Sequence, residues 1–276
     1  LSFIIFWSSA FISGQFIVQS SSPFAALTFR FFVVAICFLL FSIYFRENII
    51  VKPIIAIQAC ITGILFHGFY LGGVFFSYSV GLSATLSALI VGLQPILTNI
   101  LSGPILKEKV TFIQWIGIFL GFTGTVMVIG NDIGITIPLL GVLASIVALL
   151  GATIATIWQK KITSNLTLSV NNLYQAISAS IFLIIVSFLF ETPYINFDNR
   201  FIISMGWQII MVSFGAYAIL MYLIKTGTAS KTSNLFFLVP PVTAIMAWYI
   251  LDEKMYLIDI IGLTICAFGV YIATRK

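Results

Sequence analysis

Charged and titratable side chains that interrupt long apolar runs are the residues of this sequence with the clearest chemical potential. Arg30 and Asp259 each lie several residues inside an apolar segment, and His67 is the sole histidine. A charge inside a hydrocarbon core marks a functional site by default. For Arg30 three roles stay open: a structural anchor that could pair with Asp259, recognition of a substrate carboxylate, and snorkelling to the outer surface. His67 titrates near neutral pH, so it could sense pH or contact substrate, or serve as a neutral hydrogen-bonding group in a packed bundle.

Uncharged polar residues form a second group of candidates. Ser87, Gln94 and Thr98 are separated by seven and four residues, which places them on one face of a helix. A glutamine is costly in lipid unless it meets a partner or a cavity. Each is a candidate for ligand contact, with hydrogen bonding between helices as the alternative. The same reasoning adds Ser8, Gln15 and Asn234.

Tryptophan and tyrosine side chains form a third group, because their polar tips need partners when they are buried. His67, Tyr70 and Tyr78 lie close to one helical face. Such rings could belong to the interfacial aromatic belt. In a cavity they would instead make a pocket suited to amphipathic metabolites or cations. The aromatic candidates are Trp7, Tyr70, Tyr78, Trp158, Tyr217 and Tyr222.

The composition determines what kind of element must position these residues. Apolar residues make up 61% of the 276-residue chain and charged residues 8%, whereas soluble proteins have about 45–50% and about 25%. The 13 basic and 8 acidic side chains cannot cover the surface of a soluble protein of this length. The chain is therefore solvated by lipid, which excludes a soluble enzyme, a secreted disulfide scaffold and a disordered chain.

Long apolar runs predict an all-α membrane protein. The runs are too long and too uniformly apolar for the alternating strands of a membrane barrel, so helices remain. The first run has no basic flank and no A-x-A site, which indicates a retained helix and not a signal peptide. The ten predicted transmembrane helices cover residues 2–20, 23–45, 53–78, 83–106, 111–129, 138–159, 168–190, 201–224, 229–251 and 255–273.

Basic residues predict the orientation. With the N-terminus inside, only Arg200 and Lys254 lie in outer loops. The positive-inside rule therefore predicts that both termini are cytoplasmic. The expected location is the inner membrane of the cell. There is no run of five basic residues, so the net charge of +5 does not indicate nucleic-acid binding. The inner basic residues are Arg46, Lys52, Lys107, Lys109, Lys160, Lys161, Lys225, Lys231, Arg275 and Lys276.

An internal repeat divides the chain into two units, residues 1–129 and 138–276. Segment 93–128 aligns without a gap on 238–273, an offset of 145 residues, and Glu108-Lys109 aligns with Glu253-Lys254. Each unit holds five predicted helices. Because five is odd, the second unit must insert upside down, which gives an inverted repeat with a substrate site near the midplane around a central cavity.

Proline and glycine mark bends and close contacts. Pro95 aligns with Pro240, which Pro241 follows, and proline kinks a helix. These bends could be hinges beside the cavity or static packing kinks. Glycine pairs four residues apart let helices approach closely. The pair at 68 and 72 is expected to pack within the fold, and the pair at 117 and 121 could serve a homodimer contact.

The repeated element carries a family resemblance. "ALIVGLQPILTNILSGPILKEKVTFIQWIGIFLGFTGTVMVI" and "TSNLFFLVPPVTAIMAWYILDEKMYLIDIIGLTICAFGVYIA" resemble the two halves of EamA-type members of the drug/metabolite transporter superfamily. "WSSAFISGQ" and "PFAALTFRFF" are similar to the family's opening. The resemblance implies ten helices, a cavity lined mainly by the first, third, fourth, sixth, eighth and ninth, and transport of small metabolites, often amino-acid export.

The motifs of other functions are missing from the sequence. There is no G-x-x-x-x-G-K-[ST] loop, no H-E-x-x-H and no mid-span aspartate pair, and the three cysteines have no metal-like spacing. We expect no cofactor, no metal, no catalytic residue and no enzymatic activity. The sequence predicts a secondary transporter that moves a small organic metabolite, such as an amino acid or a related amphipathic compound, with export favoured, by alternating access. A passive channel or facilitator and an intramembrane enzyme are the alternatives.

Overall fold

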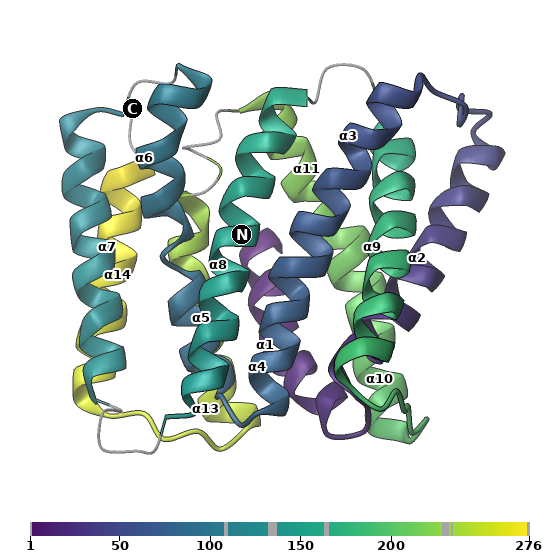
Figure 1. The fold of residues 1–276 in the computed structure, drawn as a ribbon. Coiled ribbons are helices and arrows are strands. Elements are labelled where there is room, and N and C mark those ends of the chain that lie inside the picture. Colours follow the sequence, from purple (N-terminus) through teal and green to yellow (C-terminus); the bar gives the residue numbers. More distant parts are fainter. Residues whose placement is uncertain are drawn as a thin grey trace.

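The computed structural model describes residues 2–107, 110–131, 137–162, 166–227, 232 and 234–274. Within these residues the named elements are all helical, and they stand side by side with their loops gathered at two ends (Figure 1). Several residues on which the sequence predictions rest lie outside this description: Glu108, Lys109, Asp132, Lys231, Arg275 and Lys276.

The first half of the chain forms five helical segments, two of which are broken. Proline in the first turn begins α2 and α3, where its missing N–H costs nothing. The third segment changes to π-helix in its middle, and the fourth breaks at Gly92 and Leu93. The elements are α1 (Ser2–Val18), α2 (Pro23–Tyr44), α3 (Pro53–Gly63), π-helix η1 (Ile64–Leu71), α4 (Gly72–Ser79), α5 (Ala84–Val91), α6 (Gln94–Leu106) and α7 (Phe112–Asn131).

The second half has the same plan. Thr167 and Asp198 cap α9 and α10 by accepting backbone N–H groups with their side chains. A π-helix again interrupts the eighth segment. The elements are α8 (Leu139–Ile162), α9 (Leu168–Phe190), α10 (Asn199–Trp207), π-helix η2 (Gln208–Ala216), α11 (Tyr217–Thr226), 3-10 helix η3 (Leu235–Leu238), α13 (Val239–Ile250) and α14 (Leu257–Thr274).

Element boundaries recur at the offset that aligns the two halves of the sequence. The helix starts at 23, 94 and 112 have counterparts at 168, 239 and 257, each 145 residues later. The π-helices η1 and η2 end at 71 and 216, with the same spacing. The repeat therefore extends to local backbone form, including a helix type that is rare in proteins.

One hydrogen bond recurs at this offset as well. Gln15 Nε2 donates to the Leu82 carbonyl oxygen at 2.8 Å, and Lys160 Nζ donates to the Gly227 carbonyl oxygen at 2.5 Å. Gln15 lies near the end of α1 and Lys160 near the end of α8. Each side chain bonds a carbonyl oxygen just after a segment that contains a π-helix, α3–η1–α4 for Gln15 and α10–η2–α11 for Lys160. Gln15 is thus held in a packing contact and does not line the central cavity.

The exterior of the bundle has the character of a membrane protein. Large apolar side chains such as Leu40, Phe119 and Ile203 are 61–73% exposed, while many polar side chains are buried. Six helical segments of the described chain are long and apolar enough to cross a membrane, and four shorter apolar helices accompany them. The protein is therefore a multi-pass membrane protein.

The sequence predicted that the three prolines kink continuous helices. This prediction is wrong. Pro95 lies in the first turn of α6, and Pro240 and Pro241 lie in the first turn of α13, each directly after a break in its segment. Proline is tolerated there because the first N–H groups of a helix have no partner in the helix. The two breaks are in contact: a Cβ on Gly92 would lie 2.6 Å from Pro240 Cγ.

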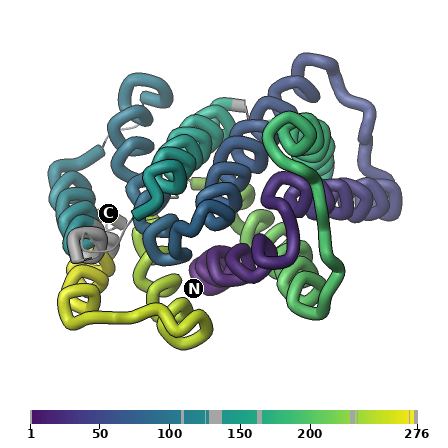
Figure 2. Tube along the Cα trace, turned by 60° about the horizontal axis from the view of Figure 1, so that its bottom comes forward, coloured from purple at the N-terminus to yellow at the C-terminus, as the bar shows by residue number. Residues whose placement is uncertain are grey.

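The glycine pairs pack inside the fold. A Cβ on Gly68 would lie 2.6 Å from the ring of Phe182 in α9, which confirms the expectation for that pair. Gly117 and Gly121 of α7 face Gly269 of α14, whose added Cβ would lie 2.6 Å from the Gly117 carbonyl oxygen. Figures 1 and 2 show α7 and α14 side by side at one edge of the bundle. The second pair therefore serves this contact and gives no support to a dimer.

Candidate functional site

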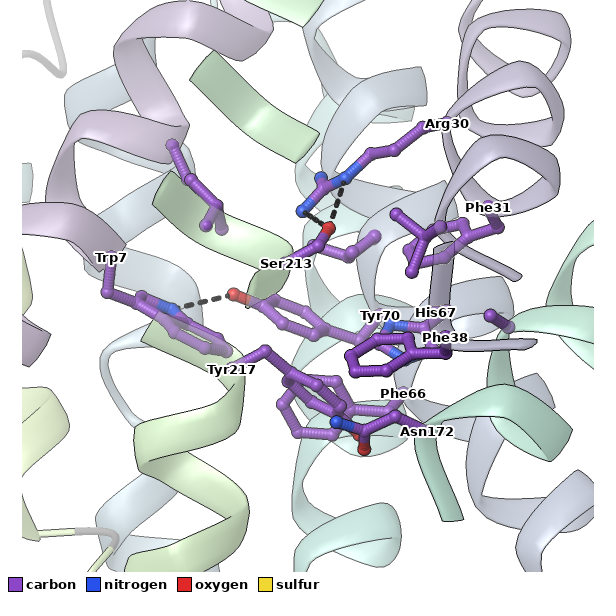
Figure 3. A pocket seen from close by; sticks show the side chains of 15 residues that line it. Trp7, Arg30, Phe31, Phe38, Phe66, His67, Tyr70, Asn172, Ser213 and Tyr217 are labelled. Carbon is purple, nitrogen blue, oxygen red and sulfur yellow. Dashed lines mark hydrogen bonds between the residues drawn. The ribbon is translucent and has the colours of Figure 1, made fainter. Parts of the chain in front are cut away.

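A small enclosed cavity lies between the two halves, where η1 and η2 meet α1, α2, α9 and α11 (Figure 3). Its volume is about 30 Å³, which is room for about two water molecules. The cavity is lined by Trp7, Ala10, Arg30, Phe31, Val34, Phe38, Phe66, His67, Tyr70, Leu71, Asn172, Ala176, Val212, Ser213 and Tyr217.

Arg30 supplies the cavity's charge. The side chain is 2% exposed, and its Nε and Nη2 donate to Ser213 Oγ at 3.1 and 2.9 Å. Its guanidinium carbon lies 5.2 Å from the centroid of the Phe31 ring. The remaining nitrogen, Nη1, is buried without a hydrogen-bond partner. The guanidinium thus rests on a neutral hydroxyl and a ring and keeps donor capacity for another group.

Arg30 and Asp259 do not pair. Asp259 accepts the backbone N–H of Tyr256 at 2.7 Å in the first turn of α14. Figure 1 places α14 and α2 at opposite edges of the bundle. The Arg30 side chain is buried and points to Ser213 (Figure 3). The ion pair and the snorkelling role considered from the sequence are therefore wrong for this conformation.

Aromatic rings form the opposite wall. Trp7 Nε1 donates to the hydroxyl of Tyr70 at 3.2 Å, and the two rings are nearly parallel. Phe66 packs edge-on against Trp7, and His67 lies 4.7 Å from the ring of Tyr217, centroid to centroid. The polar tips of Trp7 and Tyr70 satisfy each other, so these rings offer mainly apolar surface to a ligand.

Unpartnered polar atoms concentrate at this cavity. Of nine buried side-chain nitrogen and oxygen atoms without a partner in the described chain, four belong to cavity residues: Arg30 Nη1, His67 Nδ1, and both amide atoms of Asn172. Each such atom costs about 1–3 kcal/mol unless a ligand or water meets it. A set of unmet donors and acceptors around one space is the arrangement expected of a binding site.

Two amide candidates from the sequence lie outside the cavity. Gln94 Nε2 donates to Thr156 Oγ1 at 2.9 Å, which joins α6 to α8. Asn234 Oδ1 accepts from Asn99 at 2.7 Å, and its amide nitrogen donates to the Ala273 carbonyl oxygen at 3.0 Å. In this conformation both amides form hydrogen bonds between helices, which was the alternative to ligand contact.

The hydroxyl candidates are also packing residues here. Ser8 donates to the Val239 carbonyl oxygen at 3.2 Å. Ser87 lies in a cluster with Ser77 and another buried serine. Thr98 is fully buried, and its hydroxyl has no partner. None of the three candidates lines the cavity.

The aromatic candidates divide into two groups. Trp7, Tyr70 and Tyr217 line the cavity, as does His67. Trp158 instead donates from Nε1 to the Gln58 carbonyl oxygen at 3.2 Å, Tyr78 is buried elsewhere in the core, and Tyr222 is 56% exposed on the exterior. Position along an apolar segment alone could not separate the two groups, because the direction of each side chain depends on packing.

Sequence reasoning missed ten of the fifteen cavity residues, among them Phe31, Phe38, Phe66, Asn172 and Ser213. The phenylalanines carry no signal among 27 residues of that type. Asn172 did carry a signal, because it is a polar side chain in an apolar segment. The repeat aligns this segment with the one that contains Arg30. The 145-residue offset itself, however, aligns Arg30 with Gln175 and not with Asn172.

A carboxylate joins the end of α9 to the start of α2. Glu191, after α9, accepts the backbone N–H groups of Phe24 and Ala25 in the first turn of α2, the latter at 2.8 Å. Nearby, Asp198 accepts from Ser20 Oγ at 2.7 Å. Hydrogen bonds from the Phe201 N–H and then from Ser20 hold the pKa of Asp198 below its usual value. We call the contact of Glu191 with the start of α2 the Glu191 clasp.

The other end has a matching contact. Glu47, in the loop after α2, accepts a hydrogen bond from Ser169 in the first turn of α9. Tyr174 donates to the Ile49 carbonyl oxygen in the same loop at 3.0 Å. We call the contact of Glu47 with the start of α9 the Glu47 clasp. The two clasps hold the helices that carry Arg30 and Asn172, one from each end.

No group of three histidine, cysteine, aspartate or glutamate side chains in the described part of the chain could hold a metal ion. The cavity combines one guanidinium, one carboxamide, one imidazole and several aromatic rings. These groups can recognise a small molecule by charge, hydrogen bonds and ring contact.

Comparisons with known proteins give this geometry a context. A family model described as the EamA-like transporter family matches residues 1–130 and 139–275. The chain is 30% identical over 291 residues to the uncharacterized transporter YyaM of Bacillus subtilis, covering 99% of this chain and 92% of that protein. It is 26% identical to the uncharacterized transporter YvbV of the same organism, over 81% and 72% of the two chains. A solved crystal structure that is 16% identical matches 99% of this chain with a TM-score of 0.79, which shows a shared fold.

Proposed function

The chain belongs to the EamA-like transporter family, and from this premise we propose that it is a secondary transporter that moves a small organic metabolite by alternating access. The observation that carries the proposal is the enclosed cavity between the two halves, with its four unmet polar atoms. Such a site, enclosed on both sides, is the intermediate through which a carrier passes between its two open forms.

The proposed architecture is ten transmembrane helices in two inverted repeats. Support comes from the recurrence of helix starts, π-helices and the Gln15 and Lys160 hydrogen bonds at one offset. In an inverted repeat the same contact occurs once near each membrane surface. Exchanging the conformations of the two halves then converts an inward-open form into an outward-open form.

An inner-membrane location with both termini in the cytoplasm completes the proposed topology. The loops after α2 and α8 lie at the same end of the bundle as the C-terminal end of α14, and the basic residues of the inner group follow these ends (Figure 1). Arg200 and Lys254 belong to loops at the opposite end, as the positive-inside rule requires.

This topology makes a labelling prediction. In a cysteine-free background, Tyr194→Cys should react with a membrane-impermeant maleimide on intact cells, because Tyr194 is exposed in the outer loop before α10. Lys161→Cys, exposed near the end of α8, should react only after permeabilisation. We expect at least tenfold different rates between the two positions on intact cells, since a bilayer blocks the charged reagent. The reverse pattern would overturn the orientation.

The substrate class that the family resemblance favours is an amino acid or a related amphipathic compound, with export as the favoured direction. The test is flux in proteoliposomes. Purified protein should give saturable flux of a candidate substrate that is accelerated by unlabelled substrate on the opposite side. Flux without saturation or acceleration would favour the passive channel, and conversion of substrate into product would favour an intramembrane enzyme.

The clasps make a prediction about gating. With Ser213→Cys as a reporter in the cavity, Glu191→Gln should raise its labelling rate from outside about fivefold, because an amide accepts weaker hydrogen bonds than a carboxylate. Glu47→Gln should raise labelling from inside by a similar factor. Each variant is the control for the other. Equal acceleration from both sides in either variant would show that the clasps hold the fold and do not gate the cavity.

A further inference from the structure

We infer that the substrate of this cavity is an organic anion: a carboxylate attached to an apolar body, without a neighbouring ammonium group. This inference rests on the proposed transport function and narrows its substrate class. It follows from three features of the cavity, namely the state of Arg30, the absence of acidic lining residues and the ring surface.

The first feature is the unpaired cation. Arg30 is 2% exposed, and within the described residues no carboxylate forms an ion pair with it; its hydrogen bonds there go to Ser213 Oγ, and Nη1 has no partner. A buried cation without a counter-charge is strongly disfavoured. A guanidinium binds a carboxylate through two parallel hydrogen bonds. Nη1 and Nη2 can supply both, because the serine hydroxyl remains bonded to Nε. An anionic substrate would therefore complete the charge balance of the site.

The second feature is what the cavity lacks. Its fifteen lining residues include no aspartate and no glutamate. The carboxylates of Glu47 and Glu191 are engaged in the clasps at the two ends. An ammonium group in the cavity would meet only neutral acceptors, such as Asn172 Oδ1, and would be repelled by Arg30. The site therefore selects against amines and disfavours zwitterions.

The third feature is the apolar wall. Trp7, Phe66, Tyr70 and Tyr217 present ring surface, and the Trp7 and Tyr70 polar tips are bonded to each other. Asn172 offers one donor and one acceptor, both free. This surface suits an aliphatic or aromatic body with at most one neutral polar group. Together with Arg30 it defines an amphipathic anion.

Two matched sets of probes test the inference on the full-length protein. The first set is 3-phenylpropanoate, phenylalanine and 2-phenylethylamine; the second is 4-methylpentanoate, leucine and 3-methylbutylamine. Each set is an amino acid, the same molecule without its ammonium group, and the same molecule without its carboxylate. We expect the acid of each set to bind at least tenfold more tightly than its amino acid, and the amine not to bind, in equilibrium binding of radiolabelled probes to detergent-solubilised protein.

Variants assign the effect to the guanidinium. Arg30→Gln should weaken binding of the acids by about 10- to 100-fold, the range of a lost hydrogen-bonded charge pair. Arg30→Lys should recover part of the affinity, because it keeps the charge but not the paired geometry. Arg200→Gln is the matched control: Arg200 is exposed at the start of α10 and bonds Gln19, so acid binding should be unchanged. Thermal unfolding of each variant separates lost binding from lost folding.

The outcomes separate this inference from the proposed function. Tighter binding of an amino acid or amine than of its matched acid overturns the anion inference, and saturable flux of that compound still supports a carrier. Acid binding that Arg30→Gln leaves unchanged in folded protein also overturns the inference, as does failure of both acids to bind. Acid binding without saturable flux supports the anion site and counts against the carrier.

Discussion

Replacing Asn172 by leucine should stabilise the folded protein and at the same time impair transport. The Asn172 side chain is buried at the cavity with neither amide atom hydrogen-bonded. An unmet polar group of this kind costs about 1–3 kcal/mol, and an apolar side chain of similar size removes that cost. The free energy of unfolding should therefore rise by about that amount. The substrate should bind about tenfold more weakly, because it loses a hydrogen-bonding partner.

Asn99→Leu is the matched control for this prediction. Asn99 has the same side chain, but its amide donates to the Pro95 carbonyl oxygen at 2.6 Å and to Asn234 Oδ1 at 2.7 Å. The same substitution there should lower the free energy of unfolding by about 1–3 kcal/mol, since it leaves the Asn234 oxygen without this donor. Thermal unfolding in detergent and proteoliposome flux would be measured for both. A destabilised Asn172→Leu variant with normal flux would show that Asn172 is a packing residue.

Gly269→Ala should separate α7 from α14 and produce the largest loss of stability among the substitutions considered. A Cβ at this position would lie 2.5 Å from the backbone nitrogen of Gly121 and 2.6 Å from the Gly117 carbonyl oxygen. Backbone atoms cannot turn aside as a flexible side chain can, so the helices themselves must move. Overpacking typically costs 1–3 kcal/mol, and we expect about 3 kcal/mol or more here, because the neighbours are backbone on both sides.

Gly206→Ala provides the comparison. Gly206 lies in α10, and a Cβ there would have no neighbour within 4 Å. Alanine favours a helix over glycine by about 1 kcal/mol, so this variant should be as stable as the parent or slightly more so. The unfolding temperature and the monodispersity in detergent of the Gly269→Ala and Gly206→Ala variants would test both expectations. If Gly269→Ala were also harmless, the close packing of α7 on α14 would not be required for the fold.

The cavity lies between corresponding elements of the two halves. η1 and η2 occupy corresponding positions, and both contribute lining residues. π-Helical turns commonly occur at functional sites, since they redirect side chains within a helix. Yet the contents of the two sides differ: α2 brings Arg30, whereas α9 brings Asn172 and Ala176. Backbone symmetry thus suits exchange between two conformations, and the asymmetric side chains suit recognition of one substrate.

Much of the architecture could be predicted because lipid imposes simple rules on a sequence. Only helices satisfy every backbone group within apolar segments of this length, so the composition and the runs of the chain determined an all-helical membrane protein. The aligned prolines marked the two segments that break, one at Gly92 and Leu93 and the other where η3 changes to α13, and the glycines at 117 and 121 indicated close packing without identifying α14 as the partner. Such residues report backbone requirements, which depend on local sequence.

Which residues form the binding site could not be predicted from any local stretch of the sequence, because it depends on tertiary packing. Gln94 and Asn172 are both polar residues in apolar segments, but Gln94 bonds Thr156 while Asn172 meets the cavity with no partner. Arg30 is the eighth residue of α2 and Asp259 lies in the first turn of α14, and the two helices stand at opposite edges of the bundle. Helical periodicity gives the face on which a residue lies. Only the tertiary packing decides which helix covers that face, and therefore whether a polar side chain is satisfied by protein or left for a ligand.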